Sequence, residues 1–127
     1  MIVVSDTTPL RHLIAIGEAE LLPKLYGTVI VPGAVWAELQ AEATIQLASE
    51  LGADLLLMDD REGRLFALRR QLPVTGTLGV LERADVVGLL SDLPSTLARL
   101  EASGFYLSTR LRESVLARHR NRHGIGS

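Results

Sequence analysis

The chain alternates short apolar runs with segments of helical pattern, and this alternation constrains its fold more than any other feature. Three runs are rich in Val, Ile and Leu, as buried strands are: Ile2–Ser5, Thr28–Val31 and Ala53–Met58. A short fourth strand or turn is predicted at Pro73–Thr77. Because strands separated by helices usually form a parallel sheet with helices on its faces, the sequence predicts an α/β fold with about four parallel strands.

Helical patterns fill the segments between and after the strands. Gly17 is expected to divide Leu10–Leu25 into two short helices, and Ala34–Leu51 is predicted as one helix ended by Gly52. Three more helices are predicted at Leu78–Gly88, Leu93–Ser103 and Thr109–Arg122.

The segment Arg61–Leu72 is amphipathic. Its apolar residues Leu65, Phe66 and Leu68 are expected to face inward. The arginines of the same segment are then expected to face outward, and they are Arg64, Arg69 and Arg70.

Length and composition narrow the class of protein. A chain of 127 residues with 47% apolar content is expected to form one domain, residues 1–127, because domains usually have roughly 100–200 residues. No apolar run is long enough to span a membrane, and the first residues do not resemble a signal peptide. Cysteine is absent, which excludes disulfides and thiolate metal sites. We therefore expect a cytoplasmic protein without a membrane partner.

The charge distribution is uneven although the formal net charge is only −2. All basic residues except Lys24 are arginines, and after Phe105 the only acid is Glu113. An acidic body with an Arg-rich tail is typical of a protein that binds metal on one part and an anionic partner on another. The same distribution can also serve solubility alone, and the sequence leaves both interpretations open.

Acidic residues follow two of the predicted strands. Asp6 ends the first strand, and Asp59 and Asp60 end the third. Because right-handed crossovers place the carboxyl ends of parallel strands at the same edge of the sheet, these acids should lie on one edge. Open α/β sheets bind their ligands at this edge.

Glu38 is expected near the same edge, in the helix that follows the second strand. Glu42 lies four residues further and shares its helix face. Several carboxylates gathered together repel one another and need a cation, and an all-oxygen site suits Mg²⁺ or Mn²⁺. Such a metal generates hydroxide and stabilises the charge of a phosphodiester under attack. Taken singly, Asp6 could merely cap a helix and Asp59 and Asp60 could merely begin a loop.

Other kinds of site have less support in the sequence. His119 and His123 have the spacing of a metal-binding pair, but the tail around them offers no carboxylate, so a zinc site is not expected. The glycines of Thr75–Gly79 do not match a nucleotide-binding motif and predict a tight turn before a helix. The aromatic residues Tyr26, Trp36 and Phe105-Tyr106 are expected to contribute to the core or anchor a helix rather than to stack on bases.

Five segments in order resemble the PIN-domain family, and in particular its VapC-like branch. They are VVSDTTPL (3–10), YGTVIVPGAVWAEL (26–39), LGADLLLMDDREGR (51–64), LPVTGTLGVLERADVVGL (72–89) and GFYLSTRLRESVL (104–116). The resemblance implies a three-layer α/β/α fold and a ribonuclease that depends on Mg²⁺ or Mn²⁺. Members of this branch are often the toxin of a toxin–antitoxin pair, so the implied partners are RNA and an antitoxin protein.

The resemblance also implies which residues form the site. The first acid of the family falls on Asp6, the second on Glu38 and the acid after the third strand on Asp59, with Asp60 beside it as a further metal ligand. Thr7 matches the small hydroxyl residue that follows the first acid, next to the substrate. The Arg-rich tail could hold RNA phosphates through Arg118, Arg120 and Arg122.

The chain departs from the family pattern between the second acid and LGADLLL. Family members usually carry a few tens of additional residues there, including a third acid, and the matching position in this chain is Ala43. Glu42 is one residue away, about 100° around the helix. Loss of this segment should expose an apolar strip that a second copy of the chain could bury, which predicts a homodimer.

Two functions therefore remain open, an active ribonuclease and a degenerate, catalytically inactive PIN-like domain that serves as a binding or interaction module. A third interpretation, a phosphoacceptor receiver domain, rests on the run LLLMDD. Receivers need an acidic pair after the first strand and a late lysine, whereas this chain has Asp6 alone and no lysine after Lys24.

Overall fold

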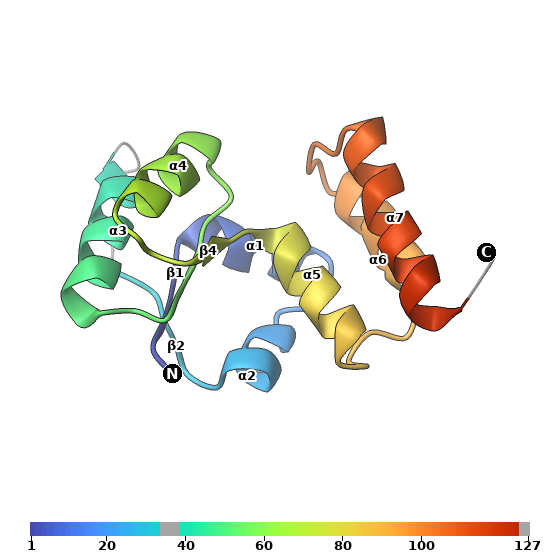
Figure 1. Ribbon diagram of the computed structural model, residues 1–127, viewed down its shortest axis with the longest axis horizontal. Helices are drawn as coiled ribbons and strands as arrows, with labels where there is room; N and C mark the ends of the chain where they lie inside the picture. Colours follow the sequence, from blue (N-terminus) through green and yellow to red (C-terminus); the bar gives the residue numbers. More distant parts are fainter. Residues whose placement is uncertain (34–38, 125–127) are drawn as a thin grey trace.

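A computed structural model describes residues 1–33 and 39–124 of the chain (Figure 1). The predicted α/β fold is confirmed, because four short strands alternate with helices along the chain. The strands are β1 (Val3–Ser5), β2 (Val29–Ile30), β3 (Leu55–Leu57) and β4 (Val74–Thr75). The helices are α1 (Thr7–Ala15), α2 (Leu21–Tyr26), α3 (Gln40–Leu51), α4 (Arg61–Arg69), α5 (Thr77–Val86), α6 (Leu93–Ala102) and α7 (Thr109–His123).

The four strands form one parallel sheet in the order β2-β1-β3-β4. β1 and β3 occupy the centre, with Val3 opposite Leu55 and Ser5 opposite Leu57. The backbone amide of Asp6 continues this pairing by donating to the carbonyl of Leu57 at 2.8 Å. The carboxyl ends of β1, β3 and β4 therefore lie together at one edge of the sheet.

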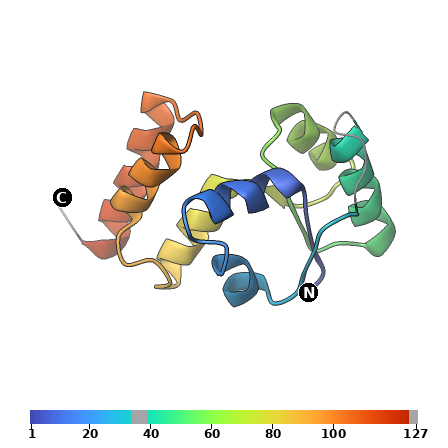
Figure 2. The same ribbon diagram turned by 180° about the vertical axis from the view of Figure 1, so that it is seen from behind.

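Alternate residues of the central strands enter two separate cores. Val3 and Leu57 belong to the core under α1, α2 and α5, which continues to α6 and α7. Val4 and Leu56 belong to the core under α3 and α4 on the opposite face. Both faces of the sheet are thus covered, and Figures 1 and 2 show the two groups of helices on either side of the strands. This burial on both faces explains why the strands are continuous apolar runs.

The helices α6 and α7 pack side by side beyond α5 (Figure 1). α6 contributes several fully buried leucines to the core, whereas Val115 is the only fully buried residue of α7. No helix in the described ranges is both long enough and apolar enough to cross a membrane.

Of the helix predicted at Ala34–Leu51, the structure describes the part from residue 39 onward. α3 begins at Gln40, after the N-cap residue Leu39, and ends as predicted at Gly52 in left-handed conformation. Its anchors on the sheet are Ile45 and Ala48, and both are buried. Residues 34–38, which include Trp36 and Glu38, lie outside the described residues.

The prediction that the large apolar residues of α4 face inward is wrong. Leu65, Phe66 and Leu68 are 42% to 56% exposed, and the helix faces the core with Gly63 and Ala67. A side chain at Gly63 would overlap the sulfur of the buried Met58. The small residues therefore let the helix backbone approach the sheet, and its large apolar side chains are left at the surface.

This close approach predicts that the substitution Gly63→Val destabilises the protein. The added side chain must displace Met58 in a filled core, which typically costs 1–3 kcal/mol of unfolding free energy, here about 2 kcal/mol. Urea denaturation measures the difference. The matched control Leu65→Val adds a β-branched residue to the exposed face of the same helix and should cost less than about 1 kcal/mol. Equal losses in the two variants would contradict the packing described here.

Candidate active site

Asp6 is the first acidic residue at the carboxyl edge of the sheet. It follows β1, is only 5% exposed and caps α1, because its Oδ1 atom accepts a hydrogen bond of 2.9 Å from the amide of Thr7. Its Oδ2 atom has no hydrogen-bond partner among the described residues. Oδ2 is therefore the oxygen that could bind a metal ion. Thr7 is half-buried beside it, in the first turn of the helix.

Asp59 is the second acidic residue at this edge, and Thr77 holds both of its oxygens. The amide of Thr77 donates to Oδ1 at 2.7 Å, and its hydroxyl donates to Oδ2 at 2.6 Å. Asp59 follows β3, whereas buried Thr77 begins α5 directly after β4. Two neighbouring strands thus fix the orientation of one carboxylate. Each carboxylate oxygen can accept more than one bond, so both could still bind a metal.

Gly76 has no side chain, and this leaves space for both the carboxylate of Asp59 and the guanidinium group of Arg64. A Cβ atom at Gly76 would lie 2.6 Å from Oδ1 of Asp59 and 3.2 Å from Nη1 of Arg64. Only glycine therefore leaves both side chains in place. Arg64 forms no ion pair within the described part of the chain, so its charge is available for a ligand.

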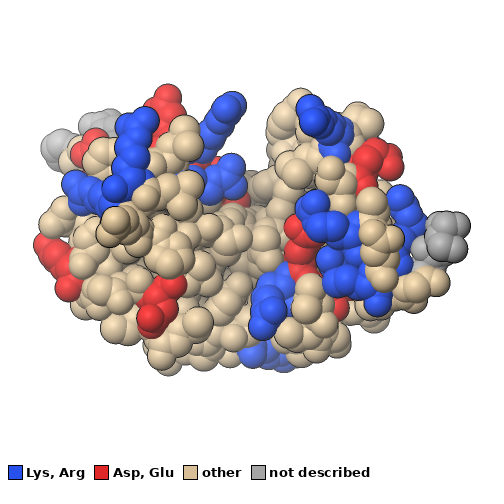
Figure 3. All heavy atoms as spheres, in the orientation of Figure 1, with Lys and Arg blue, Asp and Glu red and all other residues tan. Residues whose placement is uncertain are grey.

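A groove of about 630 Å³ opens beside Asp59, between α4 and the start of α7. Its lining includes Arg61 and Arg64 on one side and Tyr106, which is 85% exposed, on the other. Figure 3 shows a notch at this side of the molecule, with Lys and Arg side chains on both of its walls. A carboxylate, two arginines and an exposed aromatic ring therefore meet in one concave surface.

Asp60 lies apart from this groove. Its side chain caps α4 by accepting a hydrogen bond of 2.7 Å from the amide of Gly63. It lines a second cleft of about 760 Å³ between α3 and α4, together with Glu42 and Ala43. Glu42, which is exposed, and Ala43 thus share one cleft, and the carboxylates that line it are those of Glu42, Asp60 and Glu62.

The acids described at the edge do not form a complete metal site by themselves. Across residues 1–33 and 39–124, no three of the edge carboxylates lie close enough to share one ion. Glu38, the predicted second acid, lies outside these ranges. Asp6 and Asp59 remain the two hard oxygen donors that flank the central strands, and this donor type fits Mg²⁺ or Mn²⁺.

The arginines of the tail are largely paired with acids of α5. Arg118 makes a two-bond ion pair with Glu82, with nitrogen-to-oxygen distances of 2.8 and 3.0 Å. Arg122 donates to Asp85 at 2.6 and 3.0 Å. Arg120 is exposed. Of the three arginines predicted to hold RNA, two therefore already have carboxylate partners.

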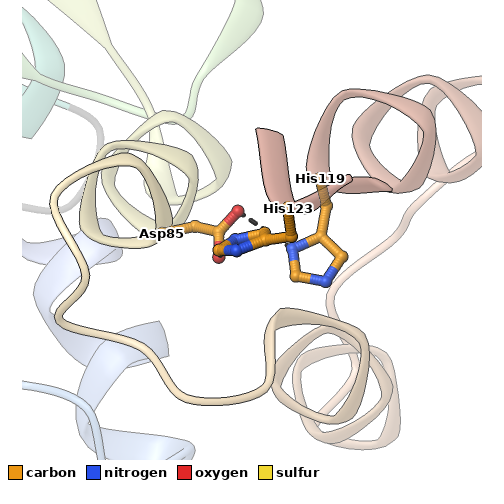
Figure 4. Close-up of side chains that lie close together, drawn as sticks. All are labelled: Asp85, His119 and His123. Atoms are coloured by element: carbon orange, nitrogen blue, oxygen red, sulfur yellow. Dashed lines mark hydrogen bonds and ion pairs between the residues drawn. The ribbon is translucent and has the colours of Figure 1, made fainter. Parts of the chain in front are cut away.

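The prediction that the two late histidines lack a carboxylate is wrong. Asp85, almost fully buried in α5, lies 3.0 Å from the ring nitrogens Nδ1 of His119 and Nε2 of His123 (Figure 4). Burial raises the pKa of Asp85, but the hydrogen bonds from His119, Arg122 and His123 outweigh it and lower the pKa to about 2. Asp85 is hence ionised in neutral solution. Its partners lie 34 to 38 residues away, so the local sequence does not reveal it.

Two further residues of this edge are functional candidates that the sequence pattern does not single out. The pattern around Thr77 predicts only a turn, although Thr77 follows a strand at the same edge as Asp6 and Asp59. The pattern around Arg64 predicts only the solvated face of an amphipathic helix. The rule that places the acids, that residues after parallel strands gather at one edge, applies equally to β4 and would have included Thr77.

The sequence of this chain was compared with models of known protein families. A family model described as a PIN domain matches residues 2–44 and 41–121. The chain belongs to the PIN-domain family. Among curated proteins and solved structures, none matches it. The two matched stretches of this PIN domain meet at residues 41–44, which is where the sequence predicts a shortened segment.

Membership in the PIN-domain family suggests which chemistry the carboxyl edge of the sheet serves. The PIN domain is a nuclease-like fold that generally uses divalent metal ions, and RNA is the partner that the family suggests. In this PIN domain the carboxylates of Asp6 and Asp59 lie at the edge where α/β folds bind ligands. Their oxygen atoms are the donor type that such ions prefer.

Proposed function

We propose that this PIN domain is a metal-dependent ribonuclease, active in the cytoplasm. Asp6, Glu38 and Asp59 would hold Mg²⁺ or Mn²⁺. Asp60 would be a further ligand if its side chain left the cap of α4. The bound ion would supply an activated water and stabilise the negative charge that develops on the phosphodiester. The chain's own residues orient the carboxylates and hold the RNA. Support comes from the family and from the position of Asp6 and Asp59 after neighbouring strands.

The observation that carries this proposal is the double hydrogen bond from Thr77 to Asp59. Closing the start of α5 accounts for the bond from the amide of Thr77, but not for the second bond from its hydroxyl. Here one residue satisfies both oxygens of an acid that lines a groove together with Arg61 and Arg64. Thr77 would thus act as a positioning residue, since it fixes the acid without touching the substrate.

The groove beside Asp59 would bind single-stranded RNA. Arg61 and Arg64 would contact phosphates, and Tyr106 would stack on a base, the combination that single-strand binding surfaces use. Thr7, next to Asp6, would contact the substrate at the far side of the edge. Secondary phosphate contacts would come from the tail, at Arg118, Arg120 and Arg122.

Within the ribonucleases, we propose more specifically that the protein is a toxin of the VapC type with an antitoxin partner. It rests on the resemblance of five sequence segments to that branch, and PIN-family membership is compatible with it. An antitoxin would act most simply by covering the groove that the RNA would occupy.

A catalytically inactive binding module is the second candidate, and one observation favours it. No three edge carboxylates lie within reach of one ion in the part of the chain that the structure describes. Ala43, at the position of the family's third acid, points in the same direction. Such a module would keep the groove and its RNA contacts without hydrolysis.

Substitution of the oriented carboxylate should abolish hydrolysis. We expect Asp59→Asn to reduce RNA cleavage with Mn²⁺ to background, because a neutral amide binds the ion poorly. Thr77→Val keeps the shape and the backbone hydrogen bond but removes the hydroxyl, and should lower kcat/KM by about 10- to 100-fold. Thr77→Ser should restore most of the activity. A fluorogenic RNA substrate measures all three.

The matched control for these variants is Asp54→Asn, at the opposite end of β3. Asp54 accepts a hydrogen bond from the amide of Ile2, and asparagine can accept the same bond. Activity should be unchanged in this variant. A wild-type protein that binds RNA but never cleaves it would overturn the ribonuclease and leave the binding module. Equal cleavage by wild type and Asp59→Asn would contradict this site.

Removal of the groove's arginines should weaken RNA binding and its salt dependence together. The double variant Arg61→Ala, Arg64→Ala is made in the inactive Asp59→Asn background. We expect the slope of the logarithm of the RNA-binding constant against the logarithm of the salt concentration to become less steep by about 1.4, because each phosphate that is no longer neutralised reduces the slope by about 0.7. Tyr106→Ala should weaken binding by about 10-fold, as removal of one stacking platform does. Fluorescence anisotropy with a single-stranded oligonucleotide measures both. Arg69→Ala, at an exposed position of the same helix that does not line the groove, is the control. An equal effect from Arg69→Ala would contradict RNA binding in the groove.

We also propose that the protein is a homodimer that buries the apolar side chains at the cleft between α3 and α4. Leu39 and Phe66 are exposed there, and neither lines the groove beside Asp59. Light scattering of the wild type should give the mass of a dimer, whereas Phe66→Glu should give a monomer. The control Ile14→Glu changes a comparably exposed apolar residue on α1 and should remain dimeric. A monomeric wild type at high concentration would refute the dimer.

A further inference from the structure

Three side chains from two helices converge at a point away from the carboxyl edge of the sheet. Asp85 comes from α5, and His119 and His123 come from successive turns of α7. Figure 4 shows both imidazole rings directed toward the one carboxylate. One oxygen of Asp85 lies 3.0 Å from Nδ1 of His119, and the other lies 3.0 Å from Nε2 of His123.

The spacing of these atoms suits a transition-metal ion. Each residue offers one ligand atom, and these atoms all lie within 4.8 Å of one another. Two ligands of a tetrahedral zinc ion, each bound at about 2.0 Å, are about 3.3 Å apart. The separation of 3.0 Å between Oδ1 of Asp85 and Nε2 of His123 therefore needs only a small adjustment to admit an ion. Nδ1 of His119 now lies 3.0 Å from the other oxygen, Oδ2, and would turn toward the ion. Two imidazoles and a carboxylate form a common zinc ligand set that leaves a fourth position for water.

Solvent can reach this cluster although its carboxylate is buried. The side chain of Asp85 is 1% exposed, whereas those of His119 and His123 are 12% and 40% exposed. An ion could therefore enter past His123 without unfolding the helix pair. Asp85 would form the inner wall of the site, and the two histidines would form its opening.

Neighbouring charges already support the carboxylate as a ligand. Arg122 donates to Oδ2 of Asp85 through Nε and Nη2, which leaves Oδ1 for the metal. A ligating carboxylate is usually held by such a second hydrogen bond. Glu82 lies 3.9 Å from Nη1 of Arg122 and partly offsets the positive charge beside the ion.

The geometry points to a binding site for one transition-metal ion, of the class of Zn²⁺, Co²⁺ or Ni²⁺, at Asp85, His119 and His123. The nitrogen ligands distinguish it from the all-oxygen edge at Asp6 and Asp59, which suits Mg²⁺ or Mn²⁺. The ion would fasten α7 to α5 across a contact in which α7 buries only Val115 fully. This site does not depend on the proposed ribonuclease.

Titration with Co²⁺ alone tests the site in the full chain, because four-coordinate Co²⁺ with imidazole ligands absorbs visible light strongly. We expect one equivalent to bind with this strong absorption and to be displaced by Zn²⁺, whereas Co²⁺ at an all-oxygen site would absorb only weakly. His119→Gln and His123→Gln should each weaken binding by roughly 100-fold. Glutamine can still donate to Asp85, so the helix contact persists. Arg120→Ala on the same helix and Asp6→Asn at the sheet edge should bind Co²⁺ as the wild type does.

A second measurement on the wild type avoids any effect of substitution on folding. The chain has three histidines, and His12 packs edge-to-face against Phe105 outside the cluster, so it serves as an internal reference. On addition of Zn²⁺, the ring nitrogen signals of His119 and His123 should shift in NMR spectra while those of His12 stay in place. Unchanged ring signals, equal shifts of all three histidines, or Co²⁺ binding that survives His123→Gln would overturn the metal site and leave a hydrogen-bonded cluster only.

Discussion

The parallel pairing of β1 with β3 is the interaction on which the rest of the molecule depends. It runs from Val3 opposite Leu55 to Ser5 opposite Leu57, and the amide of Asp6 extends it by one hydrogen bond. A shift by one residue would exchange the two faces of β1, so Val3 and Val4 would each enter the wrong core. The same shift would separate Asp6 from the end of β3. Packing of the two cores and the meeting of the acids are therefore fixed by one register.

The fold is predictable from the sequence where burial leaves a local pattern. The strands are recognisable because a strand buried on both faces consists only of apolar residues, as in the run from Leu55 to Leu57. The edge that carries Asp6 and Asp59 follows from the handedness of crossovers, which needs no knowledge of side-chain contacts. The division of the first helical segment at Gly17 is likewise visible, and the structure confirms two helices there.

The sequence misleads where the decisive contact lies far along the chain or depends on small residues. The size of the apolar residues of α4 predicts the wrong inward face, because the sheet is so close that only Gly63 and Ala67 fit. Asp85 meets His119 through a contact 34 residues away, and no periodicity signals such a pair. Glu38 lies outside the described residues, so its placement at the edge stays a prediction.

Ion pairs attach α7 to its neighbours in addition to the apolar packing of Val115. Arg112 binds Glu101 of α6 at 2.6 and 2.8 Å, and Arg118 binds Glu82 of α5. An exposed pair usually contributes less than about 1 kcal/mol, so the number of pairs matters more than any single one. The arginine content of this helix therefore has a structural explanation beside that of binding an anionic partner.

The acids at the carboxyl edge also close the ends of helices. Asp6 caps α1, Asp60 caps α4, and Asp59 accepts the first amide of α5 through Thr77. Loss of such a cap typically costs about 1 kcal/mol of stability, whether or not the protein has a catalytic activity. A descendant of this chain that had stopped cutting RNA would still be under selection to keep all three acids. Retention of these three acids in related sequences would therefore be explained by folding alone and would not by itself indicate catalytic activity.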